Sequence, residues 1–231
     1  MAREGLPLET QHTVEVLLDV VNTEDCKKAD REFSDREHVN LNERAISDLQ
    51  PLQSLSNVGE LELAGNQLVN IELLANLFNL TKLTLSENQI MDIEPLASLT
   101  RLIYLDLSGN QITNVESLAY LTRLTYLHLE ENRIFNINSL AGLIGLLHLD
   151  LSDNQIDNIS PLANLVELDF LNLNGNQIVD ITPLSNLANV QWLELENNQI
   201  QNPEPLRNLS PSVLCSAGNP WVSQVERESC Y

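Results

Sequence analysis

Seven asparagines recur along this chain at a fixed spacing of 22 residues, and this period constrains the fold more than any other feature. They are Asn66, Asn88, Asn110, Asn132, Asn154, Asn176 and Asn198. Leucine and isoleucine return in the same phase, so the repeating unit reads LxxLxxLxLxxNxIxxIxxL. Chance does not hold one phase over so many units, and the chain is therefore expected to be an array of one repeated structural unit.

The apolar positions of the unit predict one short strand and one tight turn. The LxL pair alternates as in a β-strand, with its leucines pointing inward and their neighbours outward. Isoleucine at three-residue spacing and a Pro-Leu step, as at Pro95-Leu96, indicate a 3-10-like segment on the opposite side. One unit cannot bury its own leucines, so the units must stack, with strands about 4.8 Å apart in a parallel sheet. The predicted fold class is an α/β solenoid with a parallel concave β-sheet, 3-10-like convex segments and an N-terminal helical cap.

The recurring asparagine is expected to have a structural role. An inward-pointing amide offers two donors and an acceptor to backbone groups that a turn leaves unpaired. Stacking would let each of these side chains serve two adjacent coils. The seven asparagines are therefore predicted to form a structural ladder and not a ligand site.

Both ends of the array are expected to be capped, because open ends would expose leucines. Two apolar faces at helical spacing predict two short helices before the first coil, with Thr23 as a candidate N-cap of the second. These apolar positions are Val14, Leu17, Leu18 and Val21, followed by Cys26, Ala29 and Phe33. The expected division is a helical cap over residues 1–38, about eight 22-residue units over 39–212, and a C-terminal cap over 213–231. Arg44 replaces the asparagine in the first, degenerate coil.

Two of the three cysteines lie in the C-terminal segment. Cys215 and Cys230 flank it, which leaves open either a disulfide that closes the cap or two separate thiols. In the same segment Asn219 follows Asn198 by 21 residues and precedes Trp221. We expect it to belong to a last strand and turn.

The repeat unit resembles that of leucine-rich-repeat proteins of the 22-residue class, which includes bacterial internalins and SDS22-like phosphatase regulators. The resemblance covers roughly Val39 to Leu209. The phrases Pro95-Leu96-Ala97 and Pro161-Leu162-Ala163 are more similar to the internalin type, and Gly218-Asn219-Pro220 resembles the C-terminal caps of the family. The cysteine arrangement also resembles that of secreted cyanobacterial repeat proteins. The resemblance implies a right-handed horseshoe of bacterial origin, favours secretion or the cell envelope over the cytoplasm, and leaves the function open because repeat scaffolds serve many partners.

The outward column of the sheet six residues before each asparagine contains a run of rings. From the third asparagine onward it reads Tyr104, Tyr126, His148, Phe170 and Trp192. Rings on strands also pack against each other and stabilise a sheet, which is the alternative explanation. A solvated concave face needs no such rings for solubility, however, and large amphipathic side chains are typical of binding hot spots. The column is therefore predicted to bind a protein ligand.

Acidic groups border the rings in the columns nearer the asparagines. The predicted ligand-binding residues in these columns are Asp106, His128, Asp150, Glu194 and Glu196. No lysine or arginine occurs between Ile134 and Leu206, so this half of the sheet is expected to carry a negative potential. Such a field favours a protein partner with a basic surface, although a solvated acidic face is the plainer explanation.

The composition excludes several classes of function. Asp and Glu number 33 against 12 Lys and Arg, a net charge of −21, which makes nucleic acid and anionic membranes poor partners. No apolar stretch is long enough to span a bilayer, and the N-terminus lacks the order of a signal peptide. No phosphate loop, nucleophile elbow or zinc-protease motif occurs, so neither an enzyme nor a bound cofactor is expected.

Four rival interpretations are kept. Asp106, Asp150 and Asp153 could converge on Ca²⁺, and His128 and His148 on adjacent coils could bind a metal, but neither set has the spacing of a dedicated site. A self-assembling scaffold, with the rings in a homotypic interface, is the main alternative to a monomeric binding module. The SDS22-like side of the resemblance alone implies a phosphatase regulator.

Overall fold

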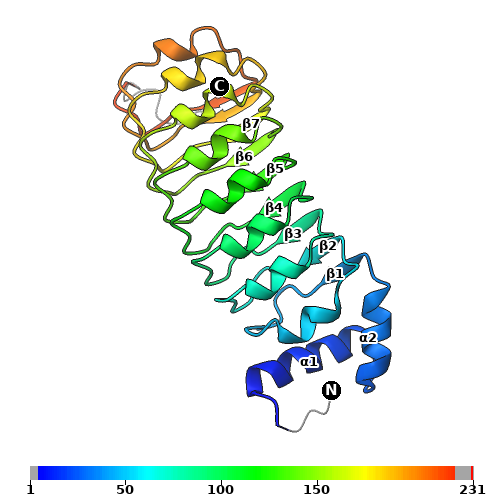
Figure 1. Ribbon diagram of the computed structural model, residues 1–231. Helices are drawn as coiled ribbons and strands as arrows, with labels where there is room; N and C mark the ends of the chain where they lie inside the picture. Colours follow the sequence, from blue (N-terminus) through cyan, green and yellow to red (C-terminus); the bar gives the residue numbers. More distant parts are fainter. Residues whose placement is uncertain (1–4, 222–229, 231) are drawn as a thin grey trace.

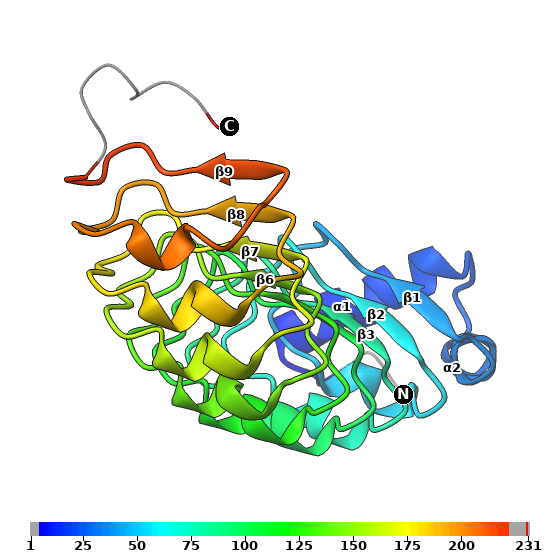
Figure 2. The ribbon, with the colours of Figure 1, turned by 90° about the horizontal axis from the view of Figure 1, so that it is seen from above.

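The computed structural model describes residues 5–221 and residue 230 and shows a curved stack of coils between two different ends. A nine-stranded parallel sheet runs through the stack in the order β1 to β9, which is also the order of the sequence. Figures 1 and 2 show the strands along one side and the short 3-10 helices along the other, with the N- and C-termini at opposite ends. The predicted solenoid class is confirmed.

Each strand spans three residues. The strands are β1 (His38–Asn40), β2 (Glu60–Glu62), β3 (Lys82–Thr84), β4 (Tyr104–Asp106), β5 (Tyr126–His128), β6 (His148–Asp150), β7 (Phe170–Asn172), β8 (Trp192–Glu194) and β9 (Val213–Cys215). The middle residue of a strand, such as Leu105 or Leu127, is buried and its two neighbours in the strand face outward. The twofold alternation in the sequence therefore becomes one apolar face and one solvated face.

The predicted convex turns are 3-10 helices. They are η1 (Gln50–Ser54), η2 (Glu72–Asn76), η3 (Glu94–Ser98), η4 (Glu116–Tyr120), η5 (Asn138–Gly142), η6 (Ser160–Asn164), η7 (Thr182–Asn186) and η8 (Glu204–Leu206). Pro95 opens η3 and Pro161 opens η6, where a missing backbone N–H is tolerated. One leucine per segment, such as Leu96, enters the core.

The asparagine ladder makes the contacts expected of it, as Asn132 shows. Its Nδ2 donates to the carbonyls of Leu107, Leu129 and Glu130 at 3.0, 3.1 and 3.2 Å, and its Oδ1 accepts from the N–H of Ile112 at 3.0 Å. One side chain thus joins its own coil to the preceding coil. Asn219 repeats the pattern after β9, so the described part of the C-terminal segment adds one more coil.

Two helices cover the N-terminal end of the stack, as expected. Helix α1 (Leu8–Val20) and helix α2 (Cys26–Ser34) contact each other and η1, and Phe33 is almost completely buried between them and the first coil. The predicted N-cap is wrong: Asp25 caps α2, because its carboxylate accepts from the N–H groups of Lys27 and Lys28 at 2.8 and 3.3 Å. Thr23 lies too far upstream, and its hydroxyl accepts from Asp25 N instead.

At the other end a disulfide joins Cys215 of β9 to Cys230, with 4.2 Å between their Cα atoms. Of the two alternatives left open by the sequence, the structure therefore has the bonded one. Cys26 at the start of α2 is a free thiol. Residues 222–229, between Asn219 and this bridge, lie outside the described part.

Candidate functional site

Five rings stand in register on five neighbouring strands of the concave sheet. Strand pairing places each ring residue opposite the next one along the column. The residues are Tyr104, Tyr126, His148, Phe170 and Trp192, and together they are called the ring row below. The buried leucines between the outward columns hold the backbone of each strand, so the row is set by the 22-residue period itself.

The rings of the row are close neighbours without forming one continuous stack. His148 and Phe170 are stacked, with centroids 3.9 Å apart and planes within 3°. The centroid distances on either side are larger, 6.0 Å from Tyr126 to His148 and 6.3 Å from Phe170 to Trp192. Tyr126 and Trp192 remain more than 40% exposed. Part of the ring surface is therefore buried in contacts between neighbouring rings, and another part is exposed to solvent.

The next outward column supplies His128 and most of the acidic groups. The His128 ring lies 5.5 Å from Tyr104 and 4.8 Å from His148, which widens the row at its centre. Burial lowers the pKa of His148, and the neighbouring His128 lowers it further, although Asp150 and Asp169 oppose the shift. His148 is therefore a neutral ring at pH 7.

Hydrogen bonds within the sheet already hold most of the carboxylates near the row. Asp106 Oδ1 accepts from Ser108 N and Oγ at 3.0 and 2.7 Å, and Asp150 makes the same pair of contacts with Ser152 at 2.9 and 2.6 Å. Glu194 accepts from the indole N–H of Trp192 and from the amide of Asn174. These contacts fix the positions of the acids and orient the Trp192 ring.

Glu130 is a charged residue in the centre of this face that sequence reasoning missed. It lies two residues after His128, in the column that holds Ser108 and Ser152 on the two adjacent coils. Its Oε2 is buried and has no hydrogen-bond donor among the described residues, and His128 Nδ1 is 3.8 Å away. Burial raises the pKa of Glu130 to about 7; a hydrogen bond from its own backbone opposes the shift, and the charges of Asp150, Asp106 and Glu131 add to it. The signal in the sequence was a glutamate between two coils that have a serine at the same position, Ser108 and Ser152.

At the N-terminal end of the same face a carboxylate has the opposite environment. Burial favours a higher pKa for Glu62, but hydrogen bonds from Lys82 and His38 outweigh it, and the pKa of Glu62 is lowered. Lys82 Nζ lies 3.2 Å from Glu62 Oε1 and 5.6 Å from the centroid of the Tyr104 ring. The chain's own ammonium group thus occupies a position between a carboxylate and the first ring of the row.

The rival calcium site is not formed. Among the described residues no group of three His, Cys, Asp or Glu side chains is placed to hold a metal ion. Asp106 and Asp150 face the sheet side and hold serines, whereas Asp153 is exposed on the turn, in a left-handed backbone conformation with φ of 51°. The rings of His128 and His148 lie 4.8 Å apart between centroids, but among the described residues no third side chain completes a metal site with them.

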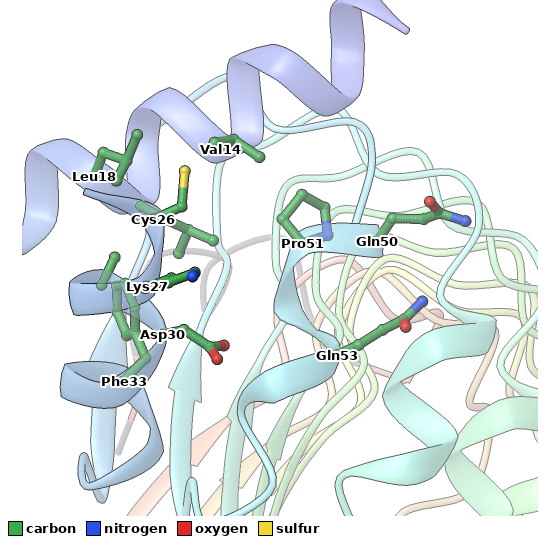
Figure 3. A pocket seen from close by; sticks show the side chains of 11 residues that line it. Val14, Leu18, Cys26, Lys27, Asp30, Phe33, Gln50, Pro51 and Gln53 are labelled. Carbon is green, nitrogen blue, oxygen red and sulfur yellow. The ribbon is translucent and has the colours of Figure 1, made fainter. Parts of the chain in front are cut away.

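A cavity of about 330 Å³ lies at the N-terminal end, outside the concave face, and was not expected from the sequence. Figure 3 shows Val14 and Leu18 of α1, Cys26 and Phe33 of α2 and Pro51 of η1 lining it. The same apolar helix positions that predicted the cap form its walls. Their packing leaves this hollow, which a periodic pattern cannot reveal.

The comparisons with known proteins agree with the geometry. A family model described as leucine-rich repeats (2 copies) matches residues 78–120, 100–144 and 144–188. No curated protein matches the chain at the level of sequence. Within residues 5–221, no helix combines the length and the apolar character needed to cross a bilayer.

Three solved structures illustrate the likeness. Internalin C2 from Listeria monocytogenes is 32% identical with a TM-score of 0.83, over 89% of this chain and 92% of that one. An internalin (inlF) from the same bacterium is 28% identical with a TM-score of 0.73, over 90% of this chain and 69% of that one. The ectodomain of the Arabidopsis thaliana receptor kinase GASSHO1/SCHENGEN3, solved in complex with CASPARIAN STRIP INTEGRITY FACTOR 2, is 29% identical with a TM-score of 0.65, over 73% of this chain but 22% of that one. Since the likeness to internalin C2 extends over nearly the whole of both chains, this chain belongs to the leucine-rich-repeat proteins with internalin-like repeats.

Proposed function

We propose that the chain is a protein-binding module that holds its partner on the concave sheet through the ring row. The observation that supports this most is the register of five rings on successive strands, with Tyr126 and Trp192 largely exposed. Large rings on a rigid surface bind with little loss of side-chain entropy and are enriched at hot spots. Repeat solenoids commonly use their extended concave surface in this way.

Packing within the sheet accounts for only part of the row. The stacked pair His148 and Phe170 has the contact expected of rings that stabilise a sheet. Trp192 lies at the end of the row, and its indole N–H donates to Glu194. Its ring remains largely exposed, so packing within the free protein does not cover it. A partner that covers this surface would gain the free energy of burying it.

The acidic border favours a partner with a basic surface. Asp106, Asp150, Glu194 and Glu196 lie in the columns beside the rings, and no lysine or arginine occurs from 134 to 206. Opposite charges steer association and align the two surfaces. In this proposal the helical cap of residues 1–38 and the C-terminal cap of 213–231 shield the ends of the repeat region, 39–212.

The proposed role is binding without a catalytic step or a cofactor. Ser108 and Ser152 donate their hydroxyl protons to Asp106 and Asp150 of their own coils, and not to a histidine base. The concave sheet is also open to solvent, so it offers no enclosure in which water is excluded. Of the two sides of the resemblance, the solved structures lie on the internalin side, and no observation favours phosphatase regulation.

The test is capture of a partner by the wild type and by ring variants. Trp192→Ala and Tyr126→Ala are expected to weaken capture at least tenfold together, which corresponds to about 1.4 kcal/mol. Tyr120→Ala on η4 is the matched control, because Tyr120 is an exposed ring outside the row. Thermal melts followed by circular dichroism should be nearly the same for all variants. Full capture by the double variant would show that this face is the wrong one.

Self-assembly is the competing use of the same face. In that case the partner is a second copy, and the ring row lies in a homotypic interface. Light scattering over a concentration series separates the two proposals. A monomer at tens of micromolar supports the binding module, whereas a dimer that Trp192→Ala dissociates supports the scaffold.

A further inference from the structure

Glu62 on this face is paired with Lys82, whereas among the described residues no lysine or arginine is paired with the carboxyl group of Glu130. Its Oε2 is enclosed without a donor among the described residues, whereas 28% of the Glu130 side chain as a whole is exposed. The serines beside it in the column, Ser108 and Ser152, donate to Asp106 and Asp150 instead. A buried acceptor without a donor is destabilised relative to one in water.

Lys82 shows how a cation is held on this sheet. Its ammonium group contacts the Glu62 carboxylate and lies over the Tyr104 ring, combining an ion pair with a cation–π contact. His38, Asn40 and Asn42 also lie within hydrogen-bond distance of Glu62. Glu130 has an aromatic border of the same kind, since its neighbour His128 lies 5.5 Å from the Tyr104 ring, but it has no lysine.

We propose that Glu130 receives one lysine or arginine side chain of the bound partner, bordered by Tyr104 and His128 and aided by the negative charge of Asp106 and Asp150. This inference rests on the proposed function, and it gives the basic partner a specific point of contact near the middle of the ring row. The partner's ammonium or guanidinium group supplies a cationic counter-charge to the Glu130 carboxyl group. It also offsets the repulsion among the three carboxylates.

A partner cation fits this point better than a metal ion. Asp106 and Asp150 each use one oxygen to hold a serine, and within the described ranges no three acidic or histidine side chains converge. Arginine and lysine carry several N–H donors and bind one carboxylate without a closed cage. The site therefore has the chemistry of one ion pair flanked by rings.

The proposed contact also depends on pH. The groups that face Glu130 are Tyr104 and Asp106 on β4, His128 on β5, His148 and Asp150 on β6, and Glu131 next in the chain. Because the pKa of Glu130 is about 7, half of the free protein carries the charge at that pH. If bound Glu130 stays ionised, affinity falls by up to about 30-fold from pH 8 to pH 5.5.

The test uses three synthetic pentapeptides that differ at the central residue, which is lysine, arginine or norleucine, between capped glycines. Binding to the whole protein is followed by NMR of carbon-labelled glutamate carboxyl groups at pH 8 and pH 5.5. The lysine and arginine peptides are expected to shift the Glu130 signal, and norleucine is not. Glu130→Gln should weaken the basic peptides at least tenfold at pH 8. Glu116→Gln, the same change at an exposed position of the convex segment η4, should alter binding less than twofold.

The outcomes separate this inference from the proposed function. Equal binding of the lysine and norleucine peptides, or unchanged lysine binding by Glu130→Gln, overturns the inference. Saturable Ca²⁺ binding that shifts Glu130 and displaces the basic peptides also overturns it, in favour of a metal site. If Trp192→Ala abolishes partner capture while Glu130→Gln leaves it intact, the proposed binding face is supported and the proposed contact with Glu130 is refuted. If neither variant changes capture, the proposed function itself is wrong.

Discussion

Replacing Glu130 with glutamine is expected to stabilise the free protein at alkaline pH. In the folded state the pKa of Glu130 is about 7, above the ordinary value of 4.5, because burial and the neighbouring carboxylates disfavour its charge. When folding raises the pKa of an acid, the protonated form contributes stability that is fully present below the ordinary pKa of 4.5. This contribution is lost as the pH rises through 7. At pH 8 the ionised group therefore destabilises the wild type. The amide that replaces the carboxyl group in Glu130→Gln carries no charge at any of these pH values.

The magnitude follows from the size of the pKa shift. A rise from 4.5 to about 7 corresponds to about 3 kcal/mol at 1.36 kcal/mol per pH unit. Solvent screening of the partly exposed side chain reduces this to about 2 kcal/mol. In a chain of this length such a gain raises the melting temperature by roughly 4 to 8 °C.

Urea denaturation followed by circular dichroism at pH 8 and pH 4.5 measures the effect. The free energy of unfolding of Glu130→Gln should exceed that of the wild type at pH 8, and the two should be nearly equal at pH 4.5. Glu196→Gln controls for the general loss of one negative charge from an acidic protein. The reasoning is refuted if the two variants gain equally, or if the gain of Glu130→Gln does not depend on pH.

Three further predictions concern the frame of the repeat. Asn132→Ala removes an amide NH2 group that contacts three backbone carbonyls and an oxygen that accepts from Ile112 N, and is expected to lower the free energy of unfolding by about 3 to 5 kcal/mol in urea denaturation. A loss below about 1 kcal/mol would show that water replaces the amide. Gly175→Ala places a Cβ 2.2 Å from Asp153 Oδ1 at a φ of 63°, and should destabilise by about 1 to 2 kcal/mol. Glu87→Gly, at the equivalent left-handed position with φ of 53°, should stabilise by about 0.5 to 1 kcal/mol, and a loss there would contradict the backbone argument.

The repeat allowed much of the surface to be predicted because it sets the phase of every coil. Once Leu105, Leu127 and their equivalents point inward, the residues beside them must form outward columns, and the ring row follows from this alone. The binding role of that row stays a prediction. The rival interpretation in which Asp153 converges with Asp106 and Asp150 is not seen among the described residues, because the order of residues in a column does not describe how a left-handed turn directs a side chain.

The ends of the chain were predictable only in part, because they lie outside the period. Helical spacing indicated α1 and α2 correctly, but the N-cap depends on which side chain reaches the free N–H groups of the first turn. Asp25, immediately before the helix, reaches them and Thr23 does not. The cavity between α1, α2 and η1 depends on how three elements pack, which no local pattern encodes.

By itself the sequence determined the stacked coils, the parallel sheet, the asparagine ladder and the order of residues in each outward column. These features depend on a period and on the burial of leucine, which act alike in every coil. Only the tertiary structure decided the state of individual side chains, such as the stacking of His148 on Phe170 and the orphaned carboxylate of Glu130. A pKa depends on burial and on charges from three different coils within a few ångströms, and those distances exist only after the coils have stacked.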